Sequence, residues 1–360
     1  MVIENIKYKI IKNVSLKSMN TLRMNVFSKF FVFITSIEEL REVIADRKNF
    51  DNILILGGGS NIFFSKYFDG LIIKMGIQGK KIVYEDENFV HLEVSAGEDW
   101  SSLVEFTVSQ GWGGIENLAM VPGTAGAAPV QNIACYGHNL HESLLSVDAI
   151  DISTSAFRRF LVDDCRLGYR TSIFKEELKG KYIIISILLK LTKHPVLNIS
   201  YKSRYESVED ELSKVANQPY TVRDVYQAIV NIRKKKLPDI SDVGTVGSVF
   251  KNPLITQQQL NNIRNMCPDI QCYPSSQLSY VDNNEIMCHE MVKVPAAWLI
   301  DDMGWAGKRH GDCGVWKSQP LNIVNYGSAS PEEYIDFINM VKDEIYNKYS
   351  IDLETEIIVV

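Results

Sequence analysis

The amino-acid sequence predicts an α+β fold, and three features support this expectation. Short apolar strands are bounded by turn residues, segments with helical spacing lie between them, and two loops of small residues follow such elements. The order is strand, first small-residue loop, strands, helix and second small-residue loop, which ends at Gly137. We therefore expect both loops to lie in one α+β domain.

Local signals justify the elements of the N-terminal half. Ser36, followed by two glutamates, is typical of a helix N-cap, and Trp100 to Gln110 has helical spacing. Alternation from Ile82 to Ser95 predicts a β-hairpin, and the continuous apolar run from Tyr182 to Leu191 predicts a strand buried on both faces. The other strands expected here are within Asn20–Phe33, then Asn52–Leu56, Gly70–Met75 and Asp148–Ser153.

Two helices dominate the expectations for the C-terminal half. Thr221 can cap a helix from Val222 to Lys236, which has an apolar stripe. Ser330, followed by a proline and then a glutamate three residues on, predicts a helix that continues to Tyr349. We also expect a linker over His194–Tyr220, a small-residue loop over Gly244–Pro253, a short helix over Pro295–Asp301 and a terminal strand over Leu353–Val360.

The two small-residue loops are the first candidates for a ligand site. The loop Gly57 to Asn61 follows a strand, so its successive N–H groups can point at phosphate oxygens. The segment Val121 to Gly137 is rich in glycine, alanine and proline, which lets backbone approach a ligand closely. The first loop carries neither a GxGxxG nor a P-loop pattern. For the second loop, the alternative explanation is a turn packed tightly under a sheet. Together the two loops favour a large dinucleotide cofactor.

Composition excludes several classes of function. A chain of 360 residues predicts two or three domains, and its formal net charge of −6 argues against binding nucleic acid. No apolar run reaches the roughly 18 residues that span a bilayer, so we expect no membrane insertion and a cytoplasmic protein. The six cysteines show no CxxC spacing and the histidines no paired spacing, so we assign no metal and no disulfide framework.

Single polar residues carry weaker signals. Arg170 follows a glycine and an aromatic residue, which by itself is typical of a surface loop. Ser248 follows a glycine but lacks the later glycine of a nucleophile elbow. The pattern therefore favours a role as proton donor or ligand contact over a role as acylated nucleophile. The basic run Arg233 to Lys236 suits the C-terminal end of a helix dipole; alternatively, one of its members reaches a diphosphate.

Taken in order, these segments resemble a known family. Over nearly the whole chain, the sequence resembles the UDP-N-acetylenolpyruvoylglucosamine reductases in six motifs: GGGSN, PGTAGAAPVQNIACYG, GYRTSIFK, KLPD, GSVFKNP and LETE. Tyr201 resembles a residue of the longer, type I members of this family. The resemblance implies an enzyme that makes UDP-N-acetylmuramate for bacterial peptidoglycan, with bound FAD and with NADPH as co-substrate.

The resemblance also implies a fold and its domains. The fold would be the vanillyl-alcohol-oxidase-like (PCMH-type) FAD-binding fold, with two α/β subdomains and a C-terminal α+β substrate domain. We expect the first FAD subdomain over residues 1–76, the second over 77–232 and the substrate domain over 233–350, with the terminal strand 351–360 returning to the first.

Three catalytic residues are implied by the matching motifs. Arg170 would stabilise negative charge that develops on the substrate, Ser248 would donate a proton to carbon, and a protonated Glu356 would hydrogen-bond the enolate form of the carboxylate. Tyr201, Lys236 and Asn252 would contact the UDP-sugar. The implied FAD-binding residues are Gly57, Gly58, Gly59, Ser60, Asn61, Pro122, Gly123, Gln131, Asn132, Ile133, Tyr136 and Gly137.

Three positions depart from the family pattern without removing a catalytic group. Thr355 stands where a proline is usual, Cys135 where a small uncharged residue is usual, and Trp316 where we expect a histidine. Two other functions stay open, an FAD oxidase of the same fold and a non-catalytic flavin or UDP-sugar binding protein. The joint presence of the three catalytic residues argues against both. We expect a monomer whose partners are UDP-N-acetylglucosamine enolpyruvate and NADPH.

Overall fold

The computed structural model describes residues 8–202, 206–274 and 291–360. Its contacts divide the chain into two compact units. Unit 1 comprises Met1–Val14, Ser28–Gly58 and Asp69–Lys235, and unit 2 comprises Ser15–Phe27, Gly59–Phe68 and Lys236–Val360. The three domains expected from the sequence stay a prediction, although one of their boundaries, at residue 232, lies near the junction at Lys235.

A four-stranded sheet and one helix form the first layer of unit 1. Helix α1 (Ile37–Ala45) begins with the capping box that Ser36 and Glu39 make, as the sequence predicts. Its buried Leu40, Val43 and Ile44 share a core with the sheet, so its apolar stripe faces the strands. The sheet order is β1 (Ile11–Ser15), β2 (Phe27–Ile34), β5 (Phe68–Met75) and β3 (Ile53–Leu56), and β3 and β5 are parallel.

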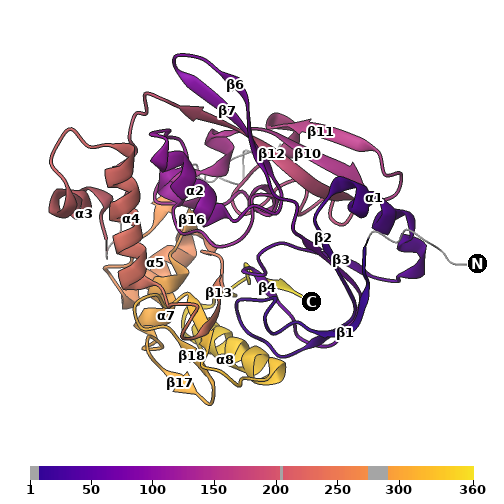
Figure 1. The fold of residues 1–360 in the computed structure, drawn as a ribbon. Helices are drawn as coiled ribbons and strands as arrows, with labels where there is room; N and C mark the ends of the chain where they lie inside the picture. Colours follow the sequence, from indigo (N-terminus) through magenta and orange to yellow (C-terminus); the bar gives the residue numbers. More distant parts are fainter. Residues whose placement is uncertain (1–7, 203–205, 275–290) are drawn as a thin grey trace, which may run out of the picture. The chain divides into compact units, whose positions relative to one another are not determined.

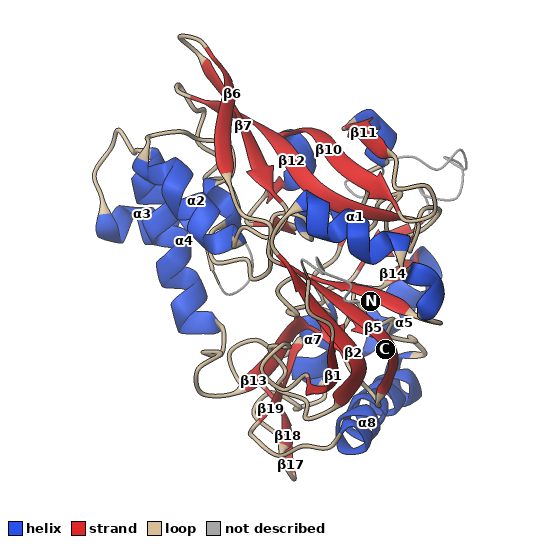
Figure 2. Ribbon diagram, turned by 45° about the vertical axis from the view of Figure 1, so that its right-hand side comes forward, coloured by secondary structure: helices blue, strands red, loops and turns tan. Residues whose placement is uncertain are grey.

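A five-stranded antiparallel sheet forms the second layer of unit 1 (Figure 1). Its order is β11 (Phe157–Leu161), β10 (Leu144–Asp151), β12 (Tyr182–Thr192), β7 (Phe89–Ser95) and β6 (Lys80–Glu85). The strand predicted over Tyr182–Leu191 and the hairpin predicted over Ile82–Ser95 are both confirmed, but the strand is not buried on both faces throughout, since Ser186 and Leu188 are half-buried and Lys190 is exposed. Helices α2 (Trp100–Ser109) and α4 (Val222–Lys236) share one apolar core with this sheet, and Figure 2 shows them beside it.

One helix of unit 1 was missed in the sequence. Helix α3 (Val208–Val215) lies inside the predicted linker, and Ser207 caps it by accepting a hydrogen bond from the Asp210 N–H. Three acids in its first turn suit the helix dipole, but only two turns are present, too few for a clear apolar period. The short elements of unit 1 are η1 (Arg47–Asn49), η2 (Glu116–Leu118), η3 (Ala128–Val130), β8 (Ala134–Cys135), β9 (His138–Asn139), η4 (Leu140–Glu142) and η5 (Asp163–Cys165).

In its described residues, unit 2 combines small sheets with three helices. One sheet has the order β13 (Gly244–Ser248), β19 (Asn322–Asn325), β18 (Cys313–Val315) and β17 (Arg309–His310), and another has β14 (Leu254–Thr256), β16 (Met291–Lys293) and β15 (Tyr273–Pro274). The strands β4 (Ile62–Phe63) and β20 (Ile358–Val359) pair in parallel. The helices are α5 (Gln257–Met266), α7 (Ala296–Asp302) and α8 (Pro331–Tyr349), and α8 begins at the predicted Ser330 capping box.

Two expectations for unit 2 are wrong. The segment predicted as a loop from Gly244 begins as strand β13, which pairs with β19. Its Gly244 lies so close to the Leu22 carbonyl that a Cβ would be 2.2 Å from the carbonyl oxygen. Glycine is there to allow a close approach. The terminal strand is confined to β20, and Thr355 instead forms an isolated bridge with Phe250.

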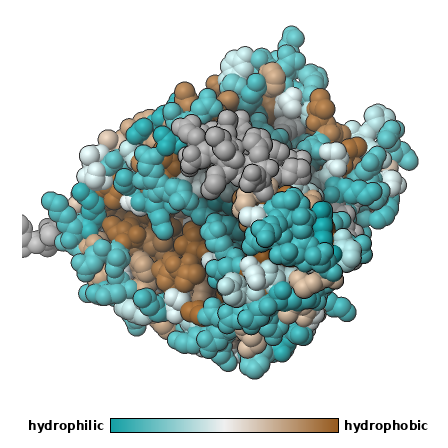
Figure 3. All heavy atoms as spheres, turned by 180° about the vertical axis from the view of Figure 1, so that it is seen from behind, coloured by the Kyte–Doolittle hydropathy of each residue, from teal (hydrophilic) through white to brown (hydrophobic). Residues whose placement is uncertain are grey.

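The surface of the described residues is mixed in polarity. Figure 3 shows a mostly hydrophilic face with a smaller hydrophobic area. Among the helices that the structure describes, none is both long and apolar enough to cross a bilayer. The described cysteines are free thiols, and Cys288 lies outside the described residues.

Candidate active site

Within unit 1, the first two residues of the first small-residue loop, Gly57 and Gly58, pack directly against the second loop. A Cβ added to Gly58 would lie 2.7 Å from the Gly123 Cα, and one added to Gly57 would lie 2.7 Å from the Thr124 Oγ1. Glycine is therefore required here by the approach of the two backbones. The packing explanation and the ligand explanation are compatible, because this contact brings the loops to one place.

The first loop also has the donors that a pyrophosphate needs. In the described part of the chain, the N–H groups of Gly58, Gly59 and Ser60 donate a hydrogen bond to no protein group. Successive free N–H groups can bind an anion, so these residues fit a phosphate-bearing cofactor such as FAD. The half-buried Lys74 donates from its ammonium to the Gly57 carbonyl, and burial lowers the pKa of this lysine.

The second loop is held in shape by its own polar side chains. Asn132 is buried, its Nδ2 donates to the Gly168 carbonyl at 3.1 Å, and its Oδ1 accepts from the His141 N–H at 3.1 Å. Both ends of this side chain are thus occupied by protein, so the cofactor contact expected of Asn132 would come from its backbone. Tyr136 is also buried, which raises the pKa of its phenol. Of the other expected residues here, Ile133 is buried, Gln131 is half-buried, and Pro122 and Gly137 are exposed.

Asn117 is a residue of this loop region that the sequence analysis missed. It is 2 % exposed, and its Nδ2 donates to the carbonyls of Tyr136 at 2.8 Å and Asn198 at 2.9 Å. It thereby joins the second loop to the segment that leads to Tyr201. A lone asparagine before the loop carries no local signal, so only the folded chain reveals this role.

Tyr201 packs against the second loop. Its ring meets the ring of Tyr136 edge to face, with centroids 5.3 Å apart. The Asn198 Nδ2 donates to the Gly137 carbonyl at 2.8 Å, which ties the same segment down a second time.

Arg170 is placed against the second loop. It occupies the turn between Gly168 and Thr171, and its Nη2 donates weakly to the Ala134 carbonyl at 3.4 Å. Its backbone is left-handed, with a φ of 56°, which a residue with a side chain adopts only at a cost. Unit 1 therefore brings the predicted catalytic arginine to the second of the predicted cofactor loops.

Cys135 is enclosed by protein groups. Its Sγ donates to the Asn117 carbonyl at 3.2 Å, and the Arg233 Nη1 lies 3.7 Å from this sulfur. Arg233 also donates from its Nη2 to the Met120 carbonyl at 3.1 Å. The basic run at the end of α4 thus includes a residue that supports the second loop, in addition to its favourable place on the helix dipole.

Unit 2 holds the other two predicted catalytic residues close together. Ser248 ends β13 after a bulge at Gly247, whose φ of 75° needs glycine although open space surrounds it. The next residues pair with the chain terminus: the Glu356 N–H donates to the Val249 carbonyl at 2.7 Å, and the Lys251 N–H donates to the Glu354 carbonyl at 2.9 Å. Glu356 therefore lies opposite the residue that follows Ser248, and it is only 9 % exposed.

Three further residues of unit 2 bear on the substrate and cofactor contacts expected there. The Lys236 carbonyl accepts from the Trp316 Nε1 at 3.1 Å, so the tryptophan that departs from the family pattern fixes the backbone of this lysine. The Asn252 Oδ1 accepts from the Ala296 N–H at 2.9 Å, at the start of α7. The amide NH2 of Asn252 is the group left to face a ligand. Asn61 accepts the Ile358 N–H at its carbonyl, at 3.0 Å.

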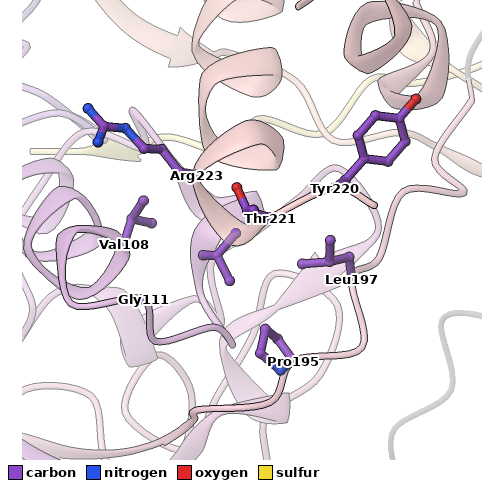
Figure 4. A pocket seen from close by; sticks show the side chains of 8 residues that line it. Val108, Gly111, Pro195, Leu197, Tyr220, Thr221 and Arg223 are labelled. Atoms are coloured by element: carbon purple, nitrogen blue, oxygen red, sulfur yellow. The ribbon is translucent and has the colours of Figure 1, made fainter. Parts of the chain in front are cut away.

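A pocket of about 310 Å³ in unit 1 is separate from these residues (Figure 4). Pro195, Leu197 and Val108 give it an apolar wall, and none of the predicted site residues lines it. The start of α4 at its edge is already capped, because the Thr221 Oγ1 accepts from the Asp224 N–H at 3.3 Å. Elsewhere in the described residues, no group of three or more His, Cys, Asp or Glu side chains is arranged to hold a metal.

Comparisons with known proteins cover both units. The profile described as "FAD binding domain" matches residues 28–158, and the one described as "UDP-N-acetylenolpyruvoylglucosamine reductase, C-terminal domain" matches residues 239–360. Curated proteins named UDP-N-acetylenolpyruvoylglucosamine reductase are similar along their length. That of Flavobacterium johnsoniae is 38% identical over 97% of this chain and 98% of its own, and that of Amoebophilus asiaticus is 36% identical over 96% and 98%.

A solved structure shows the same fold. The crystal structure of UDP-N-acetylenolpyruvylglucosamine reductase from Thermus caldophilus matches 98% of this chain and 98% of its own, with a TM-score of 0.63 and 20% sequence identity. Together with the FAD-binding profile, this match shows the α+β FAD-binding fold that the sequence predicts.

Proposed function

Because the chain belongs to the UDP-N-acetylenolpyruvoylglucosamine reductase family, we propose that Arg170, Ser248 and Glu356 carry out its reaction. The chain is an FAD-containing oxidoreductase. It reduces UDP-N-acetylglucosamine enolpyruvate to UDP-N-acetylmuramate in peptidoglycan precursor synthesis, with NADPH as co-substrate.

Each of the three residues has a role that suits its chemistry. When bound, FAD supplies the hydride that reduces the enolpyruvyl group. Negative charge then develops on the neighbouring carbon and its carboxylate, and the permanently charged fork of Arg170 stabilises it. Ser248 donates a proton to that carbon, since even a weak acid protonates a strongly basic carbon when geometry holds it. A protonated Glu356 donates a hydrogen bond to the enolate form of the substrate carboxylate.

The observation that carries this assignment is the pairing of the chain terminus with the segment after Ser248. Two backbone hydrogen bonds, from Glu356 to Val249 and from Lys251 to Glu354, hold these segments side by side. Residues more than 100 positions apart in the sequence are thus neighbours within one unit. A binding protein has no need of a hydroxyl and a nearly buried carboxylate arranged in this way, and an oxidase has no need of a proton donor for carbon.

For the UDP-sugar we propose contacts from Tyr201, Lys236 and Asn252. Tyr201 is supported by its ring contact with Tyr136, and Asn252 by the fixed orientation of its carboxamide. For the FAD we propose Gly57 to Asn61 together with the second loop, supported by the free N–H groups of Gly58 to Ser60. We also propose a cytoplasmic monomer, whose mass light scattering after gel filtration would measure.

Anaerobic stopped-flow measurement of the two half-reactions tests the assignment. In the wild type, NADPH should bleach the flavin and the enolpyruvyl UDP-sugar should restore its colour. Ser248→Ala should keep flavin bleaching within about twofold and slow the second half-reaction by at least about 100-fold, because only that step needs a proton on carbon. Ser328→Ala, an exposed serine in the same unit, is the control and should change neither step.

Two results would contradict the proposal. If the flavin colour of the wild type recovered at the same rate without the UDP-sugar, the UDP-sugar would be excluded as the electron acceptor. Equal loss of both half-reactions in Ser248→Ala, with FAD still bound, would exclude the proton-donor role.

A further inference from the structure

Arg170 lies on a turn that cannot hold its conformation by itself. Its φ of 56° is in the left-handed region, where a side chain crowds the backbone. Such a conformation persists only where the surrounding structure fixes it. The turn from Gly168 to Thr171 is closed by one backbone hydrogen bond, from the Gly168 N–H to the Thr171 carbonyl at 3.1 Å. Further contacts must therefore hold the arginine in place.

Two buried side chains supply these contacts, one on each side of the turn. The Asn132 Nδ2 donates to the Gly168 carbonyl at 3.1 Å, where the turn begins. The Ser172 Oγ donates to the Val130 carbonyl at 2.6 Å, directly after the turn ends. Asn132 is 7% exposed and Ser172 is 1% exposed, so water cannot replace either hydrogen bond readily.

Both hydrogen bonds lead to the same part of the second loop. Val130 and Asn132 lie two residues apart, within the segment that the family pattern assigns to the flavin. A third contact acts on the arginine itself, since the Lys175 Nζ donates to the Arg170 carbonyl at 2.9 Å. The Lys175 N–H in turn donates to the Ser172 Oγ at 3.3 Å, which joins this contact to the others.

We propose that Asn132 and Ser172 are positioning residues that fix the Arg170 turn to the flavin-binding loop. The inference rests on the role proposed for Arg170 and adds what sets the distance between its guanidinium and the cofactor loop. It also changes the part of Asn132, whose side chain acts on the arginine turn instead of on the cofactor. Ordinary loop packing is the alternative, and it predicts a loss of stability without a specific effect through Arg170.

A double-mutant cycle separates these explanations, because a positioning residue acts only while the residue that it positions is present. The rate to measure is the recovery of flavin colour after prereduced enzyme is mixed with the enolpyruvyl UDP-sugar. Ser172→Ala should slow it by about 10- to 100-fold in the wild-type background, as a misplaced charged group would. In an Arg170→Ala background the same substitution should change it by less than about threefold.

Two further variants complete the design. Asn132→Asp keeps the acceptor for His141 but removes the donor to Gly168, and it should behave as Ser172→Ala does. Thr171→Ala removes a hydroxyl from the same turn, but one that bonds Glu176 at 3.0 Å, and it should stay within about twofold of the wild type. Flavin reduction by NADPH, the bound-flavin spectrum and the melting temperature are recorded for each variant, at a temperature below every melting point.

The possible failures are distinguishable. Equal slowing by Ser172→Ala in both backgrounds, or no slowing by both Ser172→Ala and Asn132→Asp, would overturn the positioning role while Arg170 keeps its own. If Arg170→Ala alone left colour recovery unchanged, the proposed role of Arg170 would be wrong and this inference would be overturned with it. Should Ser172→Ala not fold, the Asn132→Asp cycle decides by the same criteria.

Discussion

At the residue scale, Lys74 supports the first loop with a side chain whose charged form is destabilised by burial. Its ammonium donates to the Gly57 carbonyl, and burial lowers its pKa from the ordinary value of 10.5. Because the folded pKa lies below the unfolded one, the folded state gains stability as the pH rises through the lowered pKa towards 10.5. At neutral pH the charged form is therefore held at a cost, and a bound pyrophosphate next to this loop would offset that cost.

Replacing this lysine should weaken cofactor binding. Lys74→Met should raise the dissociation constant for FAD by about tenfold, equivalent to about 1.4 kcal/mol, because it removes the positive charge that supports the first loop. Titration of apoprotein with FAD by calorimetry measures this. Lys81→Met, an exposed lysine on β6, is the control and should leave the constant unchanged. Unchanged affinity in Lys74→Met would mean that the lysine only fixes the Gly57 backbone.

At the scale of elements, α3 is fastened to α4 by charge. The carboxylate of Glu211 on α3 forms an ion pair with Lys235 of α4 at 2.8 Å and another with Lys214 of α3 at 3.1 Å. The Glu211 side chain is 7% exposed. The hydrogen bond from Lys235 is the main cause that lowers the pKa of this carboxyl, while burial opposes it. Both lysines are well exposed, so solvent screens the pairs and limits their contribution.

The attachment of α3 should therefore depend on pH. With its pKa lowered from 4.5, Glu211 contributes stability that is fully present above pH 4.5 and is lost as the pH falls through the lowered pKa. Glu211→Gln should cost up to about 1 kcal/mol at pH 7, and this difference should disappear in acid. Urea unfolding at several pH values measures it, with the exposed Glu209→Gln as control. A constant difference across the pH range would contradict the ionic origin.

The elements that could be predicted from sequence are those with local signals. Ser36 and Ser330 each form a capping box with a glutamate three residues on, and both helices begin where expected. Strand β13 could not be predicted, because its Gly244 is required by close packing against the Leu22 carbonyl, which is distant in the sequence. The site divides in the same way: its motifs are visible in the sequence, whereas the hydrogen bond from Asn132 to Gly168 depends on tertiary structure.

For the whole molecule, FAD is expected to add stability by mass action. The FAD-binding profile covers residues 28–158, and both small-residue loops lie within it. At about 100 times its dissociation constant, FAD should raise the free energy of unfolding by about 2.7 kcal/mol. Hydrogen exchange with and without FAD should show most of the new protection in the amides of Gly57 to Asn61 and Val121 to Gly137. Protection spread evenly over the chain would contradict the assignment of these loops.

The contact between Gly58 and Gly123 has a consequence for anyone who recombines relatives of this protein. Since a single methyl group at Gly58 would overlap the Gly123 backbone, neither loop can be exchanged without regard to the other. Chimeras with a crossover between residues 58 and 123 should keep their cofactor only when both parents have the same backbone path at both loops. Libraries should therefore inherit the two loops as one block, and diversity is better introduced in the exposed strand β6, which lies between them in sequence.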